Sequence, residues 1–199
     1  MSKLREAFEK GEFAITAEMA PPKGTDLSHL AECAKLVIGR VHAANVTDNQ
    51  SAVMRTSSLA TCKMLKDLGL EPVIQMTGRD RNRIAIESEM LSAGFFGIDN
   101  LLALTGDHVC VGDHKQAKPV FDLDAVSILS TATMMNNGTD STGLELKGKT
   151  DFFLGACVTP EYDPIEVQLL KMEKKIKAGA RFFQTQAVYD IEHMREFRK

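Results

Sequence analysis

The chain has 199 residues, 44% hydrophobic and 26% charged, which suits one globular domain with a sizeable core. The net charge is −3 and the lysines and arginines are spread along the chain, which argues against a nucleic-acid-binding protein. No apolar run approaches the roughly 18 residues of a membrane helix. The charged start MSKLREAFEKGEF lacks the apolar stretch of a secretory signal, so we expect a cytoplasmic protein that binds no membrane.

Short apolar runs that predict strands alternate along the chain with segments of helical periodicity. We expect strands at 13–20, 42–47, 71–77, 100–106, 152–160 and 181–188. We expect helices at 25–40, 57–69, 81–97, 121–138, 163–180 and 190–199. Turn residues separate these elements: Pro21 and Pro22 end the first strand, Thr25 or Asp26 is the expected N-cap of the first helix, and Gly69 closes the second helix.

The order of these elements predicts a parallel sheet. The strands read as continuous apolar runs, which is typical of strands buried on both faces. Consecutive strand–helix units with short loops favour either a (β/α)₈ TIM barrel or an open doubly wound sheet. Neither GxGxxG nor GxxxxGK[ST] occurs, and every strand ends in a polar residue, as on the active-site face of a barrel. A barrel typically needs about 250 residues, so we expect residues 1–199 to be a single α/β-barrel domain of about six units, truncated at its C-terminus.

The polar residues at the strand ends are the first candidates for chemistry. They are Glu18, Thr47, Gln75, Asp107, Thr159 and Gln186. In an apolar strand Glu18 must be paired or neutral, and burial would raise its pKa and make it a general acid, unless it forms a salt bridge to a neighbouring strand. Asp107 either binds a polar part of a ligand or caps the next turn. The Gln186 amide can hydrogen-bond both a donor and an acceptor of a heterocyclic ligand, or it can satisfy backbone groups inside the core.

A cluster of arginines follows the third expected strand. The segment TGRDRNR places Arg79, Arg81 and Arg83 at a helix start, where basic side chains and free amides suit a phosphate, although a solvated helix face explains them equally well. Lys118 could serve the same anion. Lys174 and Lys175 are, by composition alone, more typical of an exposed helix face.

The stretch LTGDHVCVGDH places three potential metal ligands close together, namely His108, Cys110 and His114. This spacing leaves open a metal-dependent lyase or hydrolase, but nothing else in the chain requires a metal, and we expect none. No two of the four cysteines are spaced as CxxC, so we expect four reduced thiols, mostly in the core.

Five motifs together resemble the methylenetetrahydrofolate reductase family. They are ITAEMAPPKGTD, NVTDNQSAVMRTSS, IQMTGRDRNRIAIESE, LLALTGDH and AGARFFQTQAVYD, in the family's order and at similar spacing. The resemblance implies a (β/α)₈ barrel that holds a flavin at the C-terminal ends of its strands. It also implies reduction of methylenetetrahydrofolate to 5-methyltetrahydrofolate, in one-carbon metabolism and methionine biosynthesis.

The resemblance implies a role for several matching positions. Glu18 matches the family's general acid, and Asp107 matches an aspartate that binds the pterin close to the flavin. Gln186 matches a glutamine that contacts the pterin or the nicotinamide donor, and Thr47 matches a flavin-contacting threonine. Lys174 and Lys175 align with basic residues that touch the cofactor's ribose or phosphates.

Four positions depart from the family pattern. Gln75 stands where many members have a flavin-binding histidine, Thr159 where many have a tyrosine, Thr105 where an arginine is common, and Gln168 where an aspartate binds the cofactor. We keep Gln75, Thr159 and Gln168 as candidate cofactor positions. The departures leave FAD or FMN open and resemble the branch of anaerobic one-carbon metabolism.

The electron source and the assembly also stay open. Electrons would come from NAD(P)H or from an iron–sulfur or other redox partner subunit, within a homo- or hetero-oligomer. A non-catalytic flavin- or folate-binding subunit of a redox complex is the alternative function.

Overall fold

The computed structural model describes residues 2–199. Its strands are β1 (Thr16–Met19), β2 (Ala43–Val46), β3 (Pro72–Thr77), β4 (Asn100–Leu104), β5 (Phe153–Val158) and β6 (Phe182–Thr185). Its α-helices are α1 (Lys3–Glu9), α2 (Ser28–Val37), α3 (Ser58–Asp67), α4 (Arg83–Phe95), α5 (Ala125–Asn136), α6 (Ile165–Lys177) and α7 (Ile191–Phe197). Two short 3₁₀ helices, η1 (Gln50–Ala52) and η2 (Val109–Val111), lie in the loops after β2 and β4.

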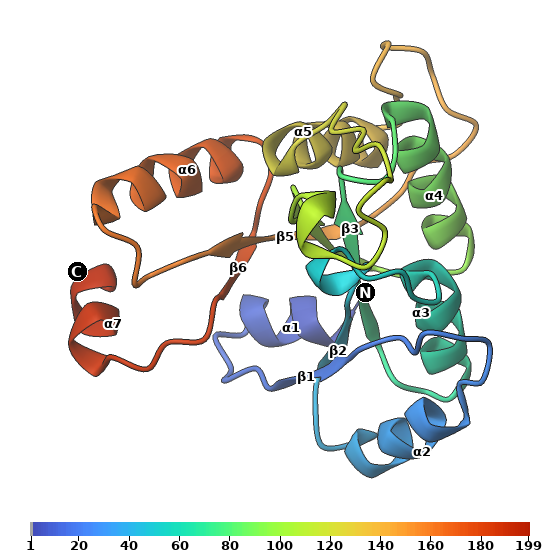
Figure 1. The fold of residues 1–199 in the computed structure, drawn as a ribbon, viewed down its shortest axis with the longest axis horizontal. Helices are drawn as coiled ribbons and strands as arrows, with labels where there is room; N and C mark the ends of the chain where they lie inside the picture. Colours follow the sequence, from blue (N-terminus) through green and yellow to red (C-terminus); the bar gives the residue numbers. More distant parts are fainter. Residues whose placement is uncertain (1) are drawn as a thin grey trace.

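The six strands of the described residues form one parallel sheet in the order β1-β2-β3-β4-β5-β6 (Figure 1). Strands that follow one another in sequence are neighbours throughout, whereas a doubly wound sheet reverses its order at a switch point. The doubly wound alternative is therefore wrong. The outer edges of β1 and β6 have no strand partner within residues 2–199, so the sheet is a curled half-barrel, and a closed eight-stranded barrel stays a prediction.

Every predicted strand and helix is present, but each is shorter than the apolar pattern predicted, at one end in β3 and β4 and at both ends in the other elements. The first strand begins at Thr16 rather than residue 13, because Phe13 is 88% exposed and lies outside the sheet. The cap of α2 also differs: Leu27 holds the N-cap position, and the Asp26 carboxylate accepts hydrogen bonds from Ser28 instead.

Helix α1 was not predicted from the sequence, although its cap and spacing carried the signal. Ser2 accepts a hydrogen bond from the backbone of Arg5, as an N-cap does. The Glu71 carboxylate, just before β3, accepts from the first backbone amides, those of Lys3 and Leu4. These contacts fix α1 across the amino ends of the strands.

The two faces of the sheet bury two separate apolar clusters, because successive side chains on a strand point to opposite faces. The outer face packs against the surrounding helices, with Val46, Ile74, Leu101 and Leu154 among its buried members. The inner face holds a smaller cluster composed of Leu4, Ala43, Val73, Leu102, Phe153 and Phe182. Leu4 belongs to α1, so this helix closes the amino end of the half-barrel.

Further along the same strands, the inner face becomes polar. The register pairs Glu18 with Asn45 and Cys157 with Gln184, one layer above the apolar cluster. Gly155 lies between the layers, and a side chain there would meet the Phe182 ring at 2.2 Å. The carboxyl ends of the strands are therefore the end of the half-barrel at which polar groups gather.

The loops at that end are tightly packed on one another. Asn49, Ser51 and Ala52 all have positive φ, at 44°, 55° and 56°. Left-handed backbone at a non-glycine residue costs on the order of 1–3 kcal/mol and tends to occur at functional sites. Gly112 touches this loop so closely that a Cβ would lie 1.8 Å from the Ala52 carbonyl oxygen. The loops after β2 and β4 therefore support each other.

Candidate active site

A cavity of about 460 Å³ lies at the carboxyl ends of the strands. All six strands or the loops after them contribute to its wall. The lining residues are Glu18, Thr47, Asp48, Asn49, Gln50, Ser51, Gln75, Thr77, Arg79, Leu104, Gly106, Asp107, Cys157, Gln184, Thr185 and Gln186. Six of them were candidates from the sequence, namely Glu18, Thr47, Gln75, Arg79, Asp107 and Gln186, so the fold brings these six together.

Glu18 lies in this wall, but its predicted burial is wrong. The side chain is exposed, because within residues 2–199 β1 has β2 as its only neighbouring strand. Neither a buried salt bridge nor an apolar environment surrounds the carboxyl group. Its position still allows it to exchange protons with solvent and to face a ligand in the cavity.

The deepest polar groups of the cavity come from β2 and β3. Thr47 is buried and its hydroxyl has no hydrogen-bond partner in the protein. The Gln75 amide is buried next to it on the wall. A buried hydroxyl without a partner loses stability unless a ligand or water satisfies it. This orphaned group therefore points to a polar ligand.

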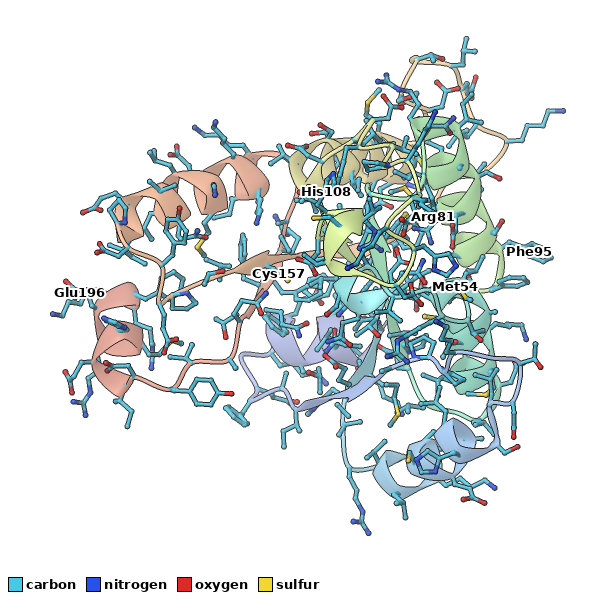
Figure 2. All side chains as sticks on the ribbon, viewed as in Figure 1. Met54, Arg81, Phe95, His108, Cys157 and Glu196 are labelled. Carbon is cyan, nitrogen blue, oxygen red and sulfur yellow. The ribbon has the colours of Figure 1, made fainter. Side chains whose placement is uncertain are left out.

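Asp48, which the sequence analysis missed, anchors the floor between β2 and β3. Its carboxylate accepts from the backbone and hydroxyl of Thr77 at 2.8 and 2.9 Å and from both Nη atoms of Arg81 at 2.7 and 3.0 Å. Arg81 also pairs with Glu89 at 2.7 Å, on the α4 side (Figure 2). Burial alone would lower the pKa of Arg81, but the hydrogen bonds and charges of both carboxylates raise it. Arg81 is therefore a permanent structural cation.

Arg79 also lines the cavity, but its guanidinium is already engaged. It is 2% exposed and pairs with Asp80 at 2.7 Å. Its Nη2 and Nη1 donate to the carbonyls of Asn49, at 3.0 Å, and Asp107, at 3.3 Å. Arg83, the third arginine of the motif, pairs with Asp122 at 2.8 Å. The guanidinium groups of Arg79 and Arg81 are engaged in ion pairs inside the protein, whereas Arg83 is half-exposed at the start of α4 and pairs with Asp122 at the surface. A role for Arg79 in cofactor binding stays a prediction.

Five predicted cofactor positions lie outside the cavity lining. They are Lys118, Thr159, Gln168, Lys174 and Lys175. Lys118 and Lys174 are exposed, whereas Gln168 is buried on α6. Lys175 donates to the Cys157 carbonyl at 2.6 Å, and burial lowers its pKa. The roles of these five in cofactor binding stay predictions.

The residues of the second candidate site are engaged locally. His108 accepts a hydrogen bond from the backbone of Cys110 through Nδ1, and its ring stacks on that of Phe121 with the ring centroids 6.3 Å apart. His114 pairs with Asp113 at 2.8 Å. No group of three or more metal-ligand residues within residues 2–199 is placed to hold a metal ion. These partners give the metal-dependent hypothesis no geometric support.

The cysteines are less buried than expected. All four are free, but only Cys62 is fully buried, whereas Cys33 and Cys157 are half-buried and Cys110 is exposed. Within residues 2–199, no helix is long and apolar enough to cross a membrane.

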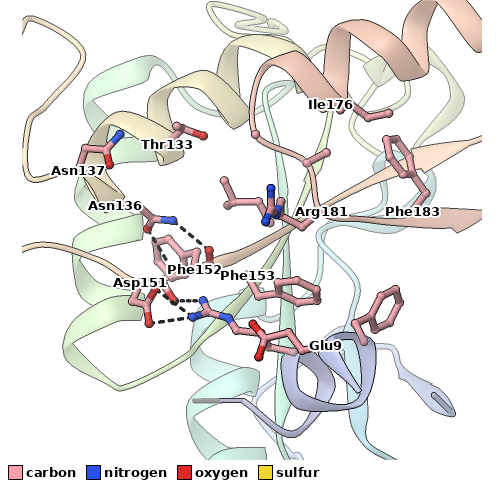
Figure 3. Close-up of a pocket in the computed structure, with 15 residues that line it drawn as sticks. Glu9, Thr133, Asn136, Asn137, Asp151, Phe152, Phe153, Ile176, Arg181 and Phe183 are labelled. Atoms are coloured by element: carbon pink, nitrogen blue, oxygen red, sulfur yellow. Dashed lines mark hydrogen bonds and ion pairs between the residues drawn. The ribbon is translucent and has the colours of Figure 1, made fainter. Parts of the chain in front are cut away.

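A larger cavity of about 790 Å³ opens at the opposite end, between α1, α5, α6 and the starts of β5 and β6 (Figure 3). Two of its polar side chains are bonded within the protein: Asp151 pairs with Arg5 at 2.9 Å, and Asn136 bonds the backbone of Phe152. Ligands of parallel α/β sheets bind at the carboxyl ends of the strands. The smaller cavity is therefore the candidate active site.

The residues that the sequence analysis did not nominate share a recognisable signal. Asp48, Asn49, Gln50 and Ser51 form a polar run directly after the apolar strand that ends at Thr47. Gln184 lies two residues before Gln186, which places both amides on the inner face. Together the wall offers exposed carboxylates at two strand ends and amides at several others. This arrangement can donate and accept protons and bind a polar heterocycle.

The sequence model of a family described as methylenetetrahydrofolate reductase matches residues 3–199. Two crystal forms of 2,3-dimethylmalate lyase, a PEP mutase/isocitrate lyase superfamily member, are similar in structure. The trigonal form has a TM-score of 0.65 and the triclinic form 0.62, each at 12% identity over 99% of this chain. The chain spans 66% and 68% of the lengths of those two structures. At such low identity the likeness shows the fold alone.

Proposed function

This chain belongs to the methylenetetrahydrofolate reductase family, and on that premise we propose that it reduces 5,10-methylenetetrahydrofolate to 5-methyltetrahydrofolate in the cavity at the carboxyl ends of its strands. The family indicates an oxidoreductase that acts on a folate. The observation that carries the proposal is that Glu18 of β1, Asp107 after β4 and Gln186 after β6 line one cavity.

The cavity fits the ring of a flavin better than its phosphates. The unpartnered Thr47 hydroxyl and the Gln75 amide are suited to a heterocycle that both donates and accepts hydrogen bonds. Among the lining residues, the basic side chain is Arg79, and its guanidinium is already bonded to Asp80 and two carbonyls. A reduced flavin bound here would supply the hydride. FAD and FMN are both consistent with this wall.

The reaction needs a hydride at the methylene carbon of the substrate and a proton at the nitrogen released when the five-membered ring opens. Glu18 is the proposed proton donor, since it is an acidic side chain at the mouth of the cavity. Its exposure lets the carboxylate take a proton back from solvent after each turnover. General acid catalysis of this kind typically contributes on the order of 10²–10⁴-fold in rate.

Asp107 and Gln186 are the proposed substrate contacts. A carboxylate accepts two hydrogen bonds from an amino-substituted ring, and a primary amide both donates and accepts. Asp107 is exposed at the end of β4, and Gln186 is exposed after β6, so both can reach a ligand between them. NAD(P)H or a redox partner subunit is the proposed electron source.

Two measurements test the proposal. The purified protein should carry a flavin absorption band, and Glu18→Gln should still accept electrons into that flavin while losing folate reduction by about 10²–10⁴-fold. Glu9→Gln, at the other end of the half-barrel, is the matched control and should leave both half-reactions unchanged. Normal folate turnover by the Glu18→Gln protein would remove Glu18 from the mechanism.

One observation favours the alternative of a binding subunit without catalysis. Among the residues that line the cavity the basic side chain is Arg79, and its guanidinium is already bonded to Asp80 and two carbonyls. Tight folate binding together with no turnover in the presence of reduced flavin would favour that alternative over the reductase.

A further inference from the structure

Arg79 is the largest fully buried polar side chain of the described residues, and it touches the loops of three neighbouring strands. It follows β3 directly. Its two Nη atoms donate to the carbonyl of Asn49, after β2, and to the carbonyl of Asp107, after β4. A planar guanidinium offers such a fork in fixed geometry, which a lysine cannot.

The partners of Arg79 are themselves held in place. The Asp80 carboxylate accepts from Nε and Nη2 of Arg79 at 2.9 and 2.7 Å and from the Asn49 amide at 3.2 Å. Asn49 in turn accepts from the backbone of Arg55, whose guanidinium donates to the carbonyl of Pro21 after β1. The network thus extends from the loop after β1 to the loop after β4.

Two backbone features lie beside the contacts of Arg79, one in each of the neighbouring loops. Asn49 is left-handed, with φ 44°, and would relax without the bonds that surround it. Gly106 has φ 89°, and a Cβ there would lie 3.1 Å from the Cβ of Arg79. The chain before Asp107 therefore lies directly against Arg79, and no other residue type suits that position.

From these contacts we propose that Arg79 is a positioning residue: it binds no cofactor phosphate, but fixes the backbone of Asp107, and through it the direction of the exposed carboxylate, relative to the left-handed loop at Asn49, and so sets the affinity for the ring of the ligand. The identity of that ligand as a folate rests on the proposed function. The positioning itself is a property of the ligand-free protein.

Amide hydrogen exchange of the ligand-free protein tests the positioning. The backbone amides of Val53, Val111 and Gly112 are bonded within the two loops and report on them. Arg79→Met should speed their exchange at least about tenfold. The free energy of local opening falls once the hydrogen bonds from Arg79 to the two loops are lost. Arg5→Met is the matched control, since Arg5 also bonds a carboxylate and a carbonyl, those of Asp151, at the opposite end of the sheet.

The variant Arg79→Lys tests the two-pronged hydrogen bonding of the guanidinium separately from its positive charge. It keeps a cation beside Asp80 and should fold like the wild type, yet it should leave at least one of the two loops exchanging fast. Wild-type exchange in both loops of the lysine variant, or of Arg79→Met, would overturn the inference.

The ligand side is tested by a double-mutant cycle on the dissociation constant for 5-methyltetrahydrofolate. Arg79→Met and Asp107→Asn should each weaken binding about tenfold, and the double variant should bind no more weakly than Asp107→Asn, because both changes remove one interaction. Additive losses would mean that Arg79 does not act through Asp107. Failure of the wild type to bind the folate would count against the proposed function alone, since the exchange experiment needs no ligand.

Discussion

The two ends of the half-barrel interior are built from the same six strands but differ in chemistry. At the amino end, Leu4 from α1 closes an apolar cluster with Leu102 and Phe182. At the carboxyl end, the same inner face carries Glu18 and Gln75 around an open cavity. One end buries surface and stabilises the fold, whereas the other holds unpartnered polar groups and costs stability. This division is typical of barrels, in which the two ends separate stability from activity.

The largest expected effect is a loss of stability from a change in the apolar cluster at the amino end. Leu4 is 2% exposed, so Leu4→Ala removes buried methyl groups and should lower the free energy of unfolding by about 2–5 kcal/mol. Urea denaturation measures this loss. Ligand affinity at low temperature should stay at the wild-type value, because α1 does not touch the cavity. A matched Ile84→Ala change, at a side chain that is 76% exposed, should have little effect on stability.

A second experiment probes the boundary between the two ends. Cys157 packs against the apolar cluster and also lines the cavity. Burial raises the pKa of its thiol, so it should react with a thiol reagent more slowly than exposed Cys110. A ligand in the cavity should slow labelling of Cys157 about tenfold or more and leave Cys110 unaffected. Mass spectrometry distinguishes the two sites, and equal protection of both thiols would contradict the assignment of the cavity.

A third substitution replaces a polar side chain of the cavity wall with an apolar one. Thr47→Val replaces an unpartnered buried hydroxyl with a methyl group of similar shape. Since that hydroxyl has no partner among the described residues and lines the cavity, flavin affinity should fall about three- to tenfold, whereas the stability of the ligand-free protein should stay the same or rise by up to about 1 kcal/mol. Flavin fluorescence titration and thermal unfolding measure the two effects, and a clear loss of ligand-free stability would argue against the orphaned hydroxyl.

The smallest effect is a pH dependence of the polar end. Partial burial alone would raise the pKa of Asp80, but hydrogen bonds from Arg79 and Asn49 leave it below its ordinary value of 3.8. Because the pKa is lower in the folded state, the stabilising contribution is complete above the ordinary value and is lost as the pH falls through the lowered one.

Asp80→Asn should therefore lower the melting temperature by about 2 °C at pH 7, a modest change because Asp80 is one third exposed. The difference from the wild type should shrink below pH 3.8. A difference that stays constant down to the lowest pH would show that the ion pair adds no stability.

The helices and strands could be predicted from the sequence more accurately than the burial of individual side chains. All six strands and their parallel order follow from apolar runs of the right length, since strands buried on both faces need them. The environment of Glu18 did not follow, because exposure depends on whether a strand has neighbours on both sides, and among the described residues β1 has one. Helix α1 was missed because its buried face is only two residues, Leu4 and Ala7.

The candidate site shows the same limit. Glu18, Asp107 and Gln186 could be named because each follows an apolar run, and chain direction places all such residues at one edge of a parallel sheet. The partners of Arg79 could not be named from the sequence, because its hydrogen bonds reach carbonyl groups that are 28 and 30 residues away along the chain. Lys118 was named for its charge and Lys174 for its match to the family's basic residues; both lie outside the cavity lining, and neither charge nor alignment indicates which way a side chain points.

By itself the sequence determined the parallel strand–helix architecture, the family, and the strand ends at which polar groups collect, because these depend on local periodicity and on the order of the residues. The tertiary structure alone decided which of those groups are free for a ligand. Asp48, Arg79 and Arg81 neutralise one another or bond backbone carbonyls, whereas the Thr47 hydroxyl is left without a partner. The reason is physical: a buried charge must find its counter-charge within a few ångströms, and only the folded chain determines which residues lie within that distance.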